Sequence, residues 1–156
     1  MSQPAVEIRP VEPGDVEQMV REMRAVDRVE ATASGFDVEQ GLRESIATSH
    51  FARTALINGR LATIGGCGRH PQSTALAPAA VPWLVGTDVL TCYPGVLQRE
   101  ARRYIAAMLE AYPHLTNVVH AENRVAVRWL KRLGFTIHPP IRMPTGALFH
   151  PFDMRA

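Results

Sequence analysis

The alternation of apolar and polar residues predicts a chain of short strands and amphipathic helices. Helical spacing is clearest over residues 123–134, where apolar side chains recur at intervals of three and four. Asn123 is a preferred N-cap, because its side-chain oxygen accepts a hydrogen bond from an unpaired first-turn N–H group. Gly134 suits the left-handed conformation that ends many helices. We therefore expect Trp129 to face the core and Arg128 to face solvent.

Three further helices are expected from the same spacing. One opens at Pro13, in the first turn where proline is tolerated, and its apolar stripe runs to Met23. The chain breaks at residues 33–35, and a second helix follows from Asp37. A long amphipathic helix is expected over residues 94–112.

Apolar segments of strand length predict strands at residues 5–9, 51–57, 61–67, 83–87, 117–120, 135–137 and 148–154. Asn58-Gly59 is a strong hairpin signal, and residues 70–82 are interpreted as a loop because they contain three prolines. The crossover from the 83–87 strand through the long helix to the 117–120 strand should be right-handed, with the two strands parallel. This order predicts an α/β (α+β) fold: a mixed, mostly antiparallel sheet with one central parallel pair and helices on both faces.

The composition indicates one soluble domain that covers residues 1–156. A chain of 156 residues can bury a single core, and its net charge of +2 is too small to indicate a nucleic-acid or membrane partner. Cys67 and Cys92 are far apart and have no paired spacing with histidines, so neither a disulfide nor a metal site is expected. The first residues lack the basic and apolar regions of a secretory signal, which favours a reducing compartment.

Two short motifs carry a resemblance to a known family. Asn-x-x-Ala at 123–126 and Leu-Gly-Phe at 133–135 resemble the last conserved block of the GNAT acyltransferases, and the expected element order is similar to theirs along essentially the whole chain. The resemblance implies binding of acetyl-CoA or CoA and transfer of an acetyl group to an amine. Residues 83–88, 99–103 and 123–140 look most like a GNAT-like branch of tailed phages, which implies a place in the host cytoplasm or in the virion.

The resemblance also implies where CoA would bind. The family holds the CoA pyrophosphate on N–H groups at the start of the helix after the fourth strand, as an anion at a helix N-terminus. The backbone of the 83–88 strand would hold the pantetheine arm. The implied CoA-binding residues are Leu84, Val85, Gly86, Gly95, Val96, Leu97, Arg99, Arg102 and Asn123.

The sequence departs from the family pattern at two places. The glycine-rich phosphate loop is reduced to Gly95, and Pro94 lacks an N–H donor, although we expect the N–H groups of residues 95–98 to be free. Leu130 stands where many members have the tyrosine that protonates the leaving thiolate. Arg99 and Arg102 either clamp phosphates or form a solvated helix face.

Asp88 and Glu122 are the candidate catalytic bases. They follow adjacent central strands, with His120 and His138 near them, at the edge where open α/β sheets bind ligands. A base at this edge can deprotonate an amine, directly or through water. In the alternative interpretation Asp88 caps a loop and the histidines are partly solvated. Cys92 is either an acyl acceptor or a small buried hydrophobic residue.

Two functions remain open from the sequence. The first is a CoA-binding protein that transfers an acetyl group to an amine of a small molecule or protein. The second is a catalytically inactive module that uses the same scaffold to bind a virion or host protein. Binding of acetyl-CoA distinguishes the two.

Overall fold

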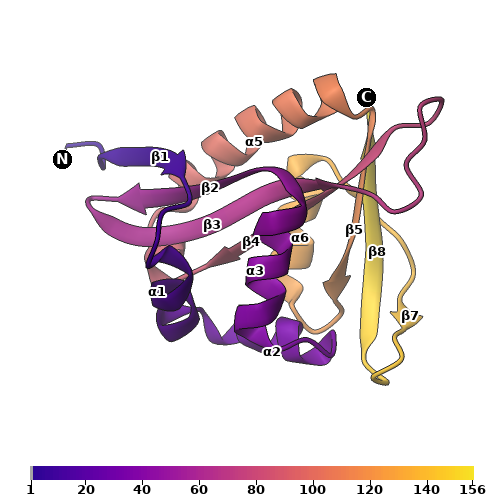
Figure 1. Ribbon diagram of the computed structural model, residues 1–156, viewed down its shortest axis with the longest axis horizontal. Coiled ribbons are helices and arrows are strands. Elements are labelled where there is room, and N and C mark those ends of the chain that lie inside the picture. The colour runs from indigo at the N-terminus through magenta and orange to yellow at the C-terminus, as the bar shows by residue number, and fades with distance from the viewer. Residues whose placement is uncertain (1) are drawn as a thin grey trace.

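The chain folds into one mixed sheet with helices on both faces, in a computed structural model that describes residues 2–156 (Figure 1). In chain order the elements are β1 (Val6–Pro10), α1 (Asp15–Glu22), α2 (Ala25–Ala33), α3 (Val38–Thr48), β2 (Ser49–Ile57), β3 (Arg60–Arg69), β4 (Ala79–Gly86), α4 (Asp88–Thr91), α5 (Pro94–Ala111), β5 (His114–His120), α6 (Arg124–Leu133), β6 (Thr136–Ile137), β7 (Ile141–Arg142) and β8 (Leu148–Arg155).

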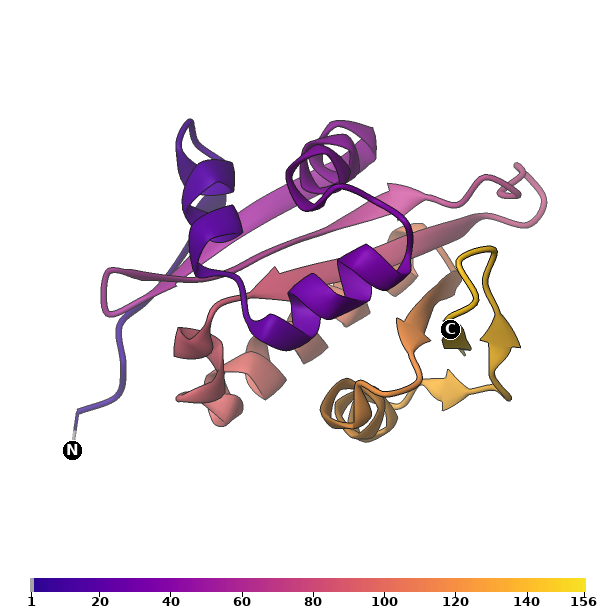
Figure 2. The ribbon, with the colours of Figure 1, turned by 90° about the horizontal axis from the view of Figure 1, so that it is seen from below.

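The sheet has the expected mixed topology. Its strand order is β1-β2-β3-β4-β5-β8-β6, with β7 paired to β8, and within residues 2–156 only β4 and β5 are parallel neighbours. α1 and α3 cover one face, and α4, α5 and α6 cover the other (Figure 2). The α/β class, the central parallel pair and the helices on both faces are therefore confirmed.

Local signals place the hairpin and the last helix where the sequence predicts them. Asn58 and Gly59 have φ angles of 51° and 75°, the left-handed pair that a type I′ turn between β2 and β3 requires. Asn123 caps α6, since its Oδ1 accepts from the Ala126 N–H at 3.2 Å, and Gly134 ends the helix with φ 103°. Trp129 packs against the buried cluster that includes Leu115, as expected from the helix phase.

The first helical segment is interrupted, which the sequence did not predict. α1 ends at Glu22, and Met23 and Arg24 are extended, with ψ angles of 137° and 145°. The reason is tertiary: Arg24 N–H donates to the carbonyl of Gly86 at 2.8 Å, and Met23 forms an antiparallel bridge with Thr87. α2 begins immediately after this bridge.

Other differences concern segments rich in proline or small residues. β4 begins at Ala79 rather than at Trp83, because Ala79 and Ala80 pair with β5. The predicted loop is therefore shorter than residues 70–82. α4 was not expected, and neither was β7, which lies between the prolines that follow β6.

His138 lies away from the carboxyl edge of β5, which corrects its predicted place in the site. Its Nε2 donates to Asp153 Oδ1 at 2.6 Å, and His114 Nε2, at the start of β5, donates to Asp153 Oδ2 at 2.9 Å. Asp153 lies opposite Thr116, four residues before His120. At about 3.3 Å per residue the separation along β5 is about 13 Å. The error arises because β6 pairs with β8 and not with β5.

Asp153→Asn should destabilise the fold by about 1–2 kcal/mol at neutral pH, because an ionised carboxylate accepts two histidine hydrogen bonds there. The hydrogen bond from His138, and then that from His114, holds the pKa of Asp153 below its usual value of 3.8. A depressed pKa contributes stability above that value and loses it as the pH falls through the lower, folded-state value. Urea denaturation at pH 7 and at pH 3 should therefore show a difference between variant and wild type that shrinks in acid. A difference that is independent of pH would contradict the assignment.

Candidate functional site

The central strands separate and leave an opening in the sheet. β4 and β5 pair only at Ala79 with His114 and at Ala80 with Leu115, and beyond these pairs the strands diverge (Figure 1). Asn117 on β5 still reaches across, since its Nδ2 donates to the carbonyl of Pro82 at 2.8 Å. β4 and β5 are therefore parallel neighbours, as predicted, and they separate toward Asp88 and His120.

The opening exposes one unpaired stretch of β4 backbone. In an antiparallel pair, successive residues direct their N–H and C=O groups to alternating sides. The carbonyls of Pro82 and Gly86 both face away from β3, because they accept from Asn117 and from Arg24 N–H. Leu84 lies between them in an unbroken register with β3, so its N–H and C=O also face the opening. The β4–β5 pairing ends before Leu84, which leaves this edge available.

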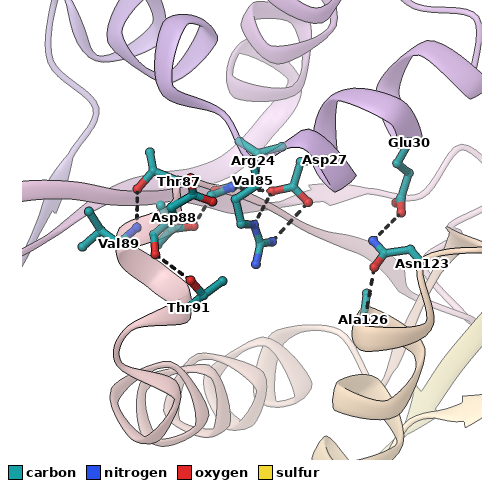
Figure 3. A network of polar contacts seen from close by, with 12 residues as sticks. Arg24, Asp27, Glu30, Val85, Thr87, Asp88, Val89, Thr91, Asn123 and Ala126 are labelled. Carbon is teal, nitrogen blue, oxygen red and sulfur yellow. Dashed lines mark hydrogen bonds and ion pairs between the residues drawn. The ribbon is translucent and has the colours of Figure 1, made fainter.

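α2 spans the open end of the gap and connects the ends of both strands (Figure 3). At the β4 end, Asp27 Oδ2 accepts from Gly86 N–H at 2.8 Å. At the β5 end, Glu30 Oε2 accepts from His120 N–H at 3.3 Å and from Asn123 Nδ2 at 3.1 Å. The three-residue spacing of Asp27 and Glu30 places both on one side of the helix. α2 therefore fixes how far β4 and β5 stand apart.

Glu30 is the carboxylate that the sequence analysis missed. Burial is the main cause that raises its pKa above the usual 4.5, and the hydrogen bonds from Asn123 and His120 oppose the shift. Oε2 has both of these partners, whereas Oε1 has none and is not among the buried unpaired atoms of residues 2–156. Because Glu30 also lines the cleft, Oε1 is accessible from it. The available signal was the three-residue spacing of Arg24, Asp27 and Glu30 at the start of α2.

Arg24 and Asp27 form a paired unit at the end of β4. Arg24 Nε and Nη2 donate to the two carboxylate oxygens of Asp27 at 2.9 and 3.1 Å. A Cβ on Gly86 would lie 2.8 Å from Leu90 Cδ2 and 3.2 Å from the carbonyl oxygen of Ala62, so a larger residue there would require the buried Leu90 side chain to shift. The pair is bidentate and largely buried, which orients the guanidinium and leaves Nη1 unbonded within the described chain.

A cleft of about 730 Å³ passes through the opening. This volume is within the range of about 300–1,000 Å³ that is typical of ligand sites. Its lining comes from α2 and α3 on one side of the sheet, from α4, α5 and α6 on the other, and from β4 and β5 between them. A ligand can therefore approach the Leu84 edge from either face of the sheet.

The start of α5 offers fewer free N–H groups than the sequence suggested. Val96 and Leu97 N–H both donate to the carbonyl of Tyr93, at 3.1 and 3.2 Å, which corrects the expectation that residues 95–98 are free. Pro94 has no N–H group. Gly95 N–H is the one first-turn donor without an acceptor among residues 2–156. The side chains of Val96 and Leu97 instead form part of the apolar cleft wall.

The arginines of α5 lie on its outer side. Arg99 and Arg103 both form ion pairs with Glu100, at 3.2 and 2.9 Å, and Arg102 is exposed. None of these arginines lines the cleft, although Glu100 does. They therefore place positive charge outside the cleft lining rather than within it.

The predicted catalytic residues fall into different environments. Asp88 is exposed at the start of α4, lines the cleft and has no side-chain partner among residues 2–156. Glu122 is exposed after β5 and does not line the cleft. His120 is buried, with its ring against Phe149 at 5.1 Å. Asn123 uses both ends of its amide group, as the cap of α6 and as a donor to Glu30.

Neither cysteine is placed for acyl transfer. Cys92 is exposed, which corrects the expectation of a buried residue, and it lies outside the cleft lining. Burial raises the pKa of the Cys67 thiol to about 11, so the thiol stays protonated and unreactive. Within residues 2–156 no group of three or more His, Cys, Asp or Glu side chains could hold a metal ion, and no helix is long and apolar enough to cross a membrane.

The α6 side of the cleft has no tyrosine at the position of Leu130, whose side chain is buried. Its neighbour Trp129 lines the cleft with its ring. Trp129 Nε1 is fully buried and is the only such side-chain donor or acceptor in residues 2–156 that has no partner. No side chain at these two positions can transfer a proton to a leaving group.

Comparison with known proteins identifies the fold. No protein-family model and no curated protein sequence matches the chain. A GNAT-family acetyltransferase from Streptococcus agalactiae is similar at 14% identity and a TM-score of 0.63, over 97% of this chain and 95% of that one. An aminoglycoside N(6')-acetyltransferase from Legionella pneumophila is similar at 10% identity and a TM-score of 0.73, over 99% and 94%.

The aminoglycoside acetyltransferase AAC(6')-Ib, solved with coenzyme A, is similar at 14% identity and a TM-score of 0.70, over 97% of this chain and 95% of that one. At such identities the likeness shows the fold alone. The chain therefore has the GNAT acetyltransferase fold, and these similarities give no support to the phage branch.

Proposed function

We propose that the protein binds acetyl-CoA or CoA in the cleft between β4 and β5 and transfers the acetyl group to an amine. The observation that carries the proposal is the unpaired N–H and C=O of Leu84, which face the same cleft as the accessible carboxylate of Glu30. The Leu84 backbone can bind an amide-containing arm, and the Glu30 carboxylate can bind and deprotonate an amine. The aminoglycoside acetyltransferase with the same fold and bound coenzyme A supports this ligand class.

The residues on the α5 side fit a CoA-type ligand in part. Leu84 offers a strand edge, and Val96 and Leu97 an apolar wall. Gly95 N–H, with Arg99 and Arg102 of α5, would meet the phosphates. The proposed binding set is Leu84, Val85, Gly86, Gly95, Val96, Leu97, Arg99, Arg102 and Asn123. Within that set Gly86 and Asn123 act through the contacts that hold α2 in place.

Acetyl-CoA supplies a thioester whose carbonyl carbon forms a C–N bond with the amine while the C–S bond breaks. Glu30 takes the proton that the acceptor ammonium must lose, since its raised pKa makes it a stronger base than an exposed glutamate. Asn123 and His120 N–H hold the other oxygen of this carboxylate. After the C–N bond forms, the nitrogen loses its second proton to water. Leu130 provides no acid, so the departing thiolate takes its proton from water. The products are an amide and free CoA.

Asp88 is the second free carboxylate of the cleft and stays a proposed base, to be tested beside Glu30. Glu122 was paired with Asp88 in the sequence analysis. Its place outside the cleft lining makes it the weaker of the two proposals.

A second candidate is an inactive GNAT-fold module that binds a virion or host protein. The observation that favours it is the incomplete phosphate site, where Pro94 lacks a donor and Val96 and Leu97 N–H are already bonded. The pattern of residues 83–88 and 123–140 supports the phage source that this candidate assumes. Loss of CoA binding would leave it as the better explanation.

Addition of CoA or acetyl-CoA should raise the melting temperature. At a ligand concentration near 100 times the Kd, binding adds about 2.7 kcal/mol to the free energy of unfolding. For a chain of this size the shift is about 5–10 °C. Arg99→Glu with Arg102→Glu should abolish the shift, because both charges lie beside the start of α5. The measurement is differential scanning fluorimetry with up to millimolar ligand.

The matched control is Arg21→Glu with Arg155→Glu, which makes the same charge change on exposed residues of α1 and β8. This control should keep the full shift. A wild-type melting temperature that does not move in millimolar acetyl-CoA would reject the acetyltransferase proposal in favour of the binding module.

A further inference from the structure

The cleft has an apolar rim formed by exposed side chains of α2, of the segment after α2 and of the start of α6. Val26 lies four residues before Glu30 on α2, which places both side chains on the same helix face. Val125 lies two residues after Asn123, whose side chain bonds Glu30. Phe36 follows the end of α2, and all three apolar side chains line the cleft while remaining 44–64% exposed. Exposed apolar residues that gather at a cleft indicate contact with a ligand rather than with solvent.

The charge of the cleft is opposite in sign to that of the chain. Two guanidinium groups line it, Arg24 and Arg53, against five carboxylates, which gives a formal charge of −3 where the whole chain has +2. Asp27 is paired with Arg24, Glu100 is paired with Arg99 and Arg103, and Asp37 caps α3 through one oxygen. Glu30 and Asp88 are the remaining carboxylates of the lining. Near Glu30 such a lining favours a cationic ligand, whereas the phosphates of CoA would lie at the start of α5, beside Arg99 and Arg102.

We infer that the acceptor is a small primary amine with an apolar body, an alkylamine or arylalkylamine that carries a single positive charge. Its ammonium group donates to Glu30 Oε1, and its apolar part contacts Val26, Phe36 and Val125. This inference depends on the proposed function for its chemistry, but the binding of the amine does not require CoA. A polyamine would leave its further charges against the apolar rim, so it fits less well.

The test is a titration of 2-phenylethylamine into the wild-type protein, in the absence of any acyl-CoA, followed by NMR chemical shifts. We expect at least tenfold tighter binding than for 2-phenylethanol, which has the same body without the charge, and than for spermidine. Glu30→Gln should weaken the binding of 2-phenylethylamine at least tenfold. Glutamine keeps the hydrogen bonds from Asn123 and His120 but lacks the negative charge. Glu110→Gln, an exposed glutamate outside the cleft, should leave binding unchanged.

A second variant tests the apolar part of the ligand separately from its positive charge. Phe36→Ser should weaken the binding of 2-phenylethylamine about tenfold and leave the binding of ethylamine unchanged. The Phe36 side chain is exposed, so its loss should not unfold the chain. Equal or tighter binding of spermidine or of 2-phenylethanol would overturn the inference. If CoA binds but 2-phenylethylamine does not, the acceptor class is wrong and the proposed function stands. If the amine binds but CoA does not, the proposed function is wrong and the amine site stands.

Discussion

Glu30→Gln should lower kcat for amine acetylation by about 100- to 10,000-fold, the usual contribution of a positioned general base. The substitution preserves the shape of the side chain and its acceptor for Asn123 Nδ2 and His120 N–H. What it removes is the oxygen at which the ammonium can leave its proton. The measurement is the rate of free thiol release from acetyl-CoA at saturating amine. Retention of more than a third of wild-type kcat would show that Glu30 is not the base and would direct attention to Asp88.

The same substitution has an opposite effect on stability, which separates a catalytic role from a structural one. Burial raises the pKa of Glu30, so its ionised form is less favourable in the folded state than in the unfolded state. The contribution of a group with a raised pKa is fully present below its unfolded value of about 4.5 and is lost as the pH rises through the folded value. Glu30→Gln should therefore unfold at a higher urea concentration than wild type above that pH. Wild-type kcat should rise over the same interval, because only the ionised carboxylate accepts a proton.

A matched control is needed because any loss of negative charge changes the field of a small protein. Glu110→Gln makes the same chemical change on the exposed side of α5, outside the cleft lining. This variant should retain kcat within a factor of two. If both variants lose activity together, the loss has an electrostatic or folding origin and the assignment of Glu30 fails.

Sequence pattern predicted the features that short-range interactions determine. The turn at Asn58-Gly59, the cap at Asn123 and the stop at Gly134 each depend on residues within one turn of the chain, and all three are present. The parallel pair of β4 and β5 followed from the crossover through the long helix that connects them. These features were sufficient to place the opening in the sheet.

The arrangement of α2 could not be predicted in the same way, because its determinants are distant in sequence. Arg24 N–H and Asp27 replace the partner that β5 no longer provides to Gly86. In sequence, Glu30 resembles an ordinary solvent-facing helical acid, and only its packing against the end of β5 buries it. The position of His138 was predicted wrongly for a related reason, because it depends on which strand β6 pairs with.

The free N–H groups expected at the start of α5 show a further limit of motif reasoning. A helix N-terminus normally leaves its first donors unpaired. Here Val96 and Leu97 N–H turn back to the carbonyl of Tyr93. The fold can therefore be that of the GNAT acetyltransferases while the start of α5 offers an anion fewer N–H donors than the sequence suggested.

Trp129→Ala should lower the free energy of unfolding by about 3–5 kcal/mol, because the indole packs against the buried cluster that contains Leu115 and Leu130. Arg128→Ala, on the neighbouring exposed position, should change it by less than about 0.5 kcal/mol. Urea denaturation of both variants tests the phase of α6. Equal losses would show that the helix faces the sheet differently.

Trp129→Phe distinguishes the two parts of the indole. The ring contributes apolar contact, whereas the buried Nε1–H has no acceptor among residues 2–156. An unpaired buried donor costs about 1–3 kcal/mol, so its removal offsets part of the area lost with the smaller ring. We therefore expect the free energy of unfolding of Trp129→Phe to be within about 1 kcal/mol of the wild-type value, a much smaller loss than that of the alanine variant. A loss as large as that of Trp129→Ala would mean that Nε1–H finds a partner in solution, and the α6 wall of the cleft would then have to be rearranged around it.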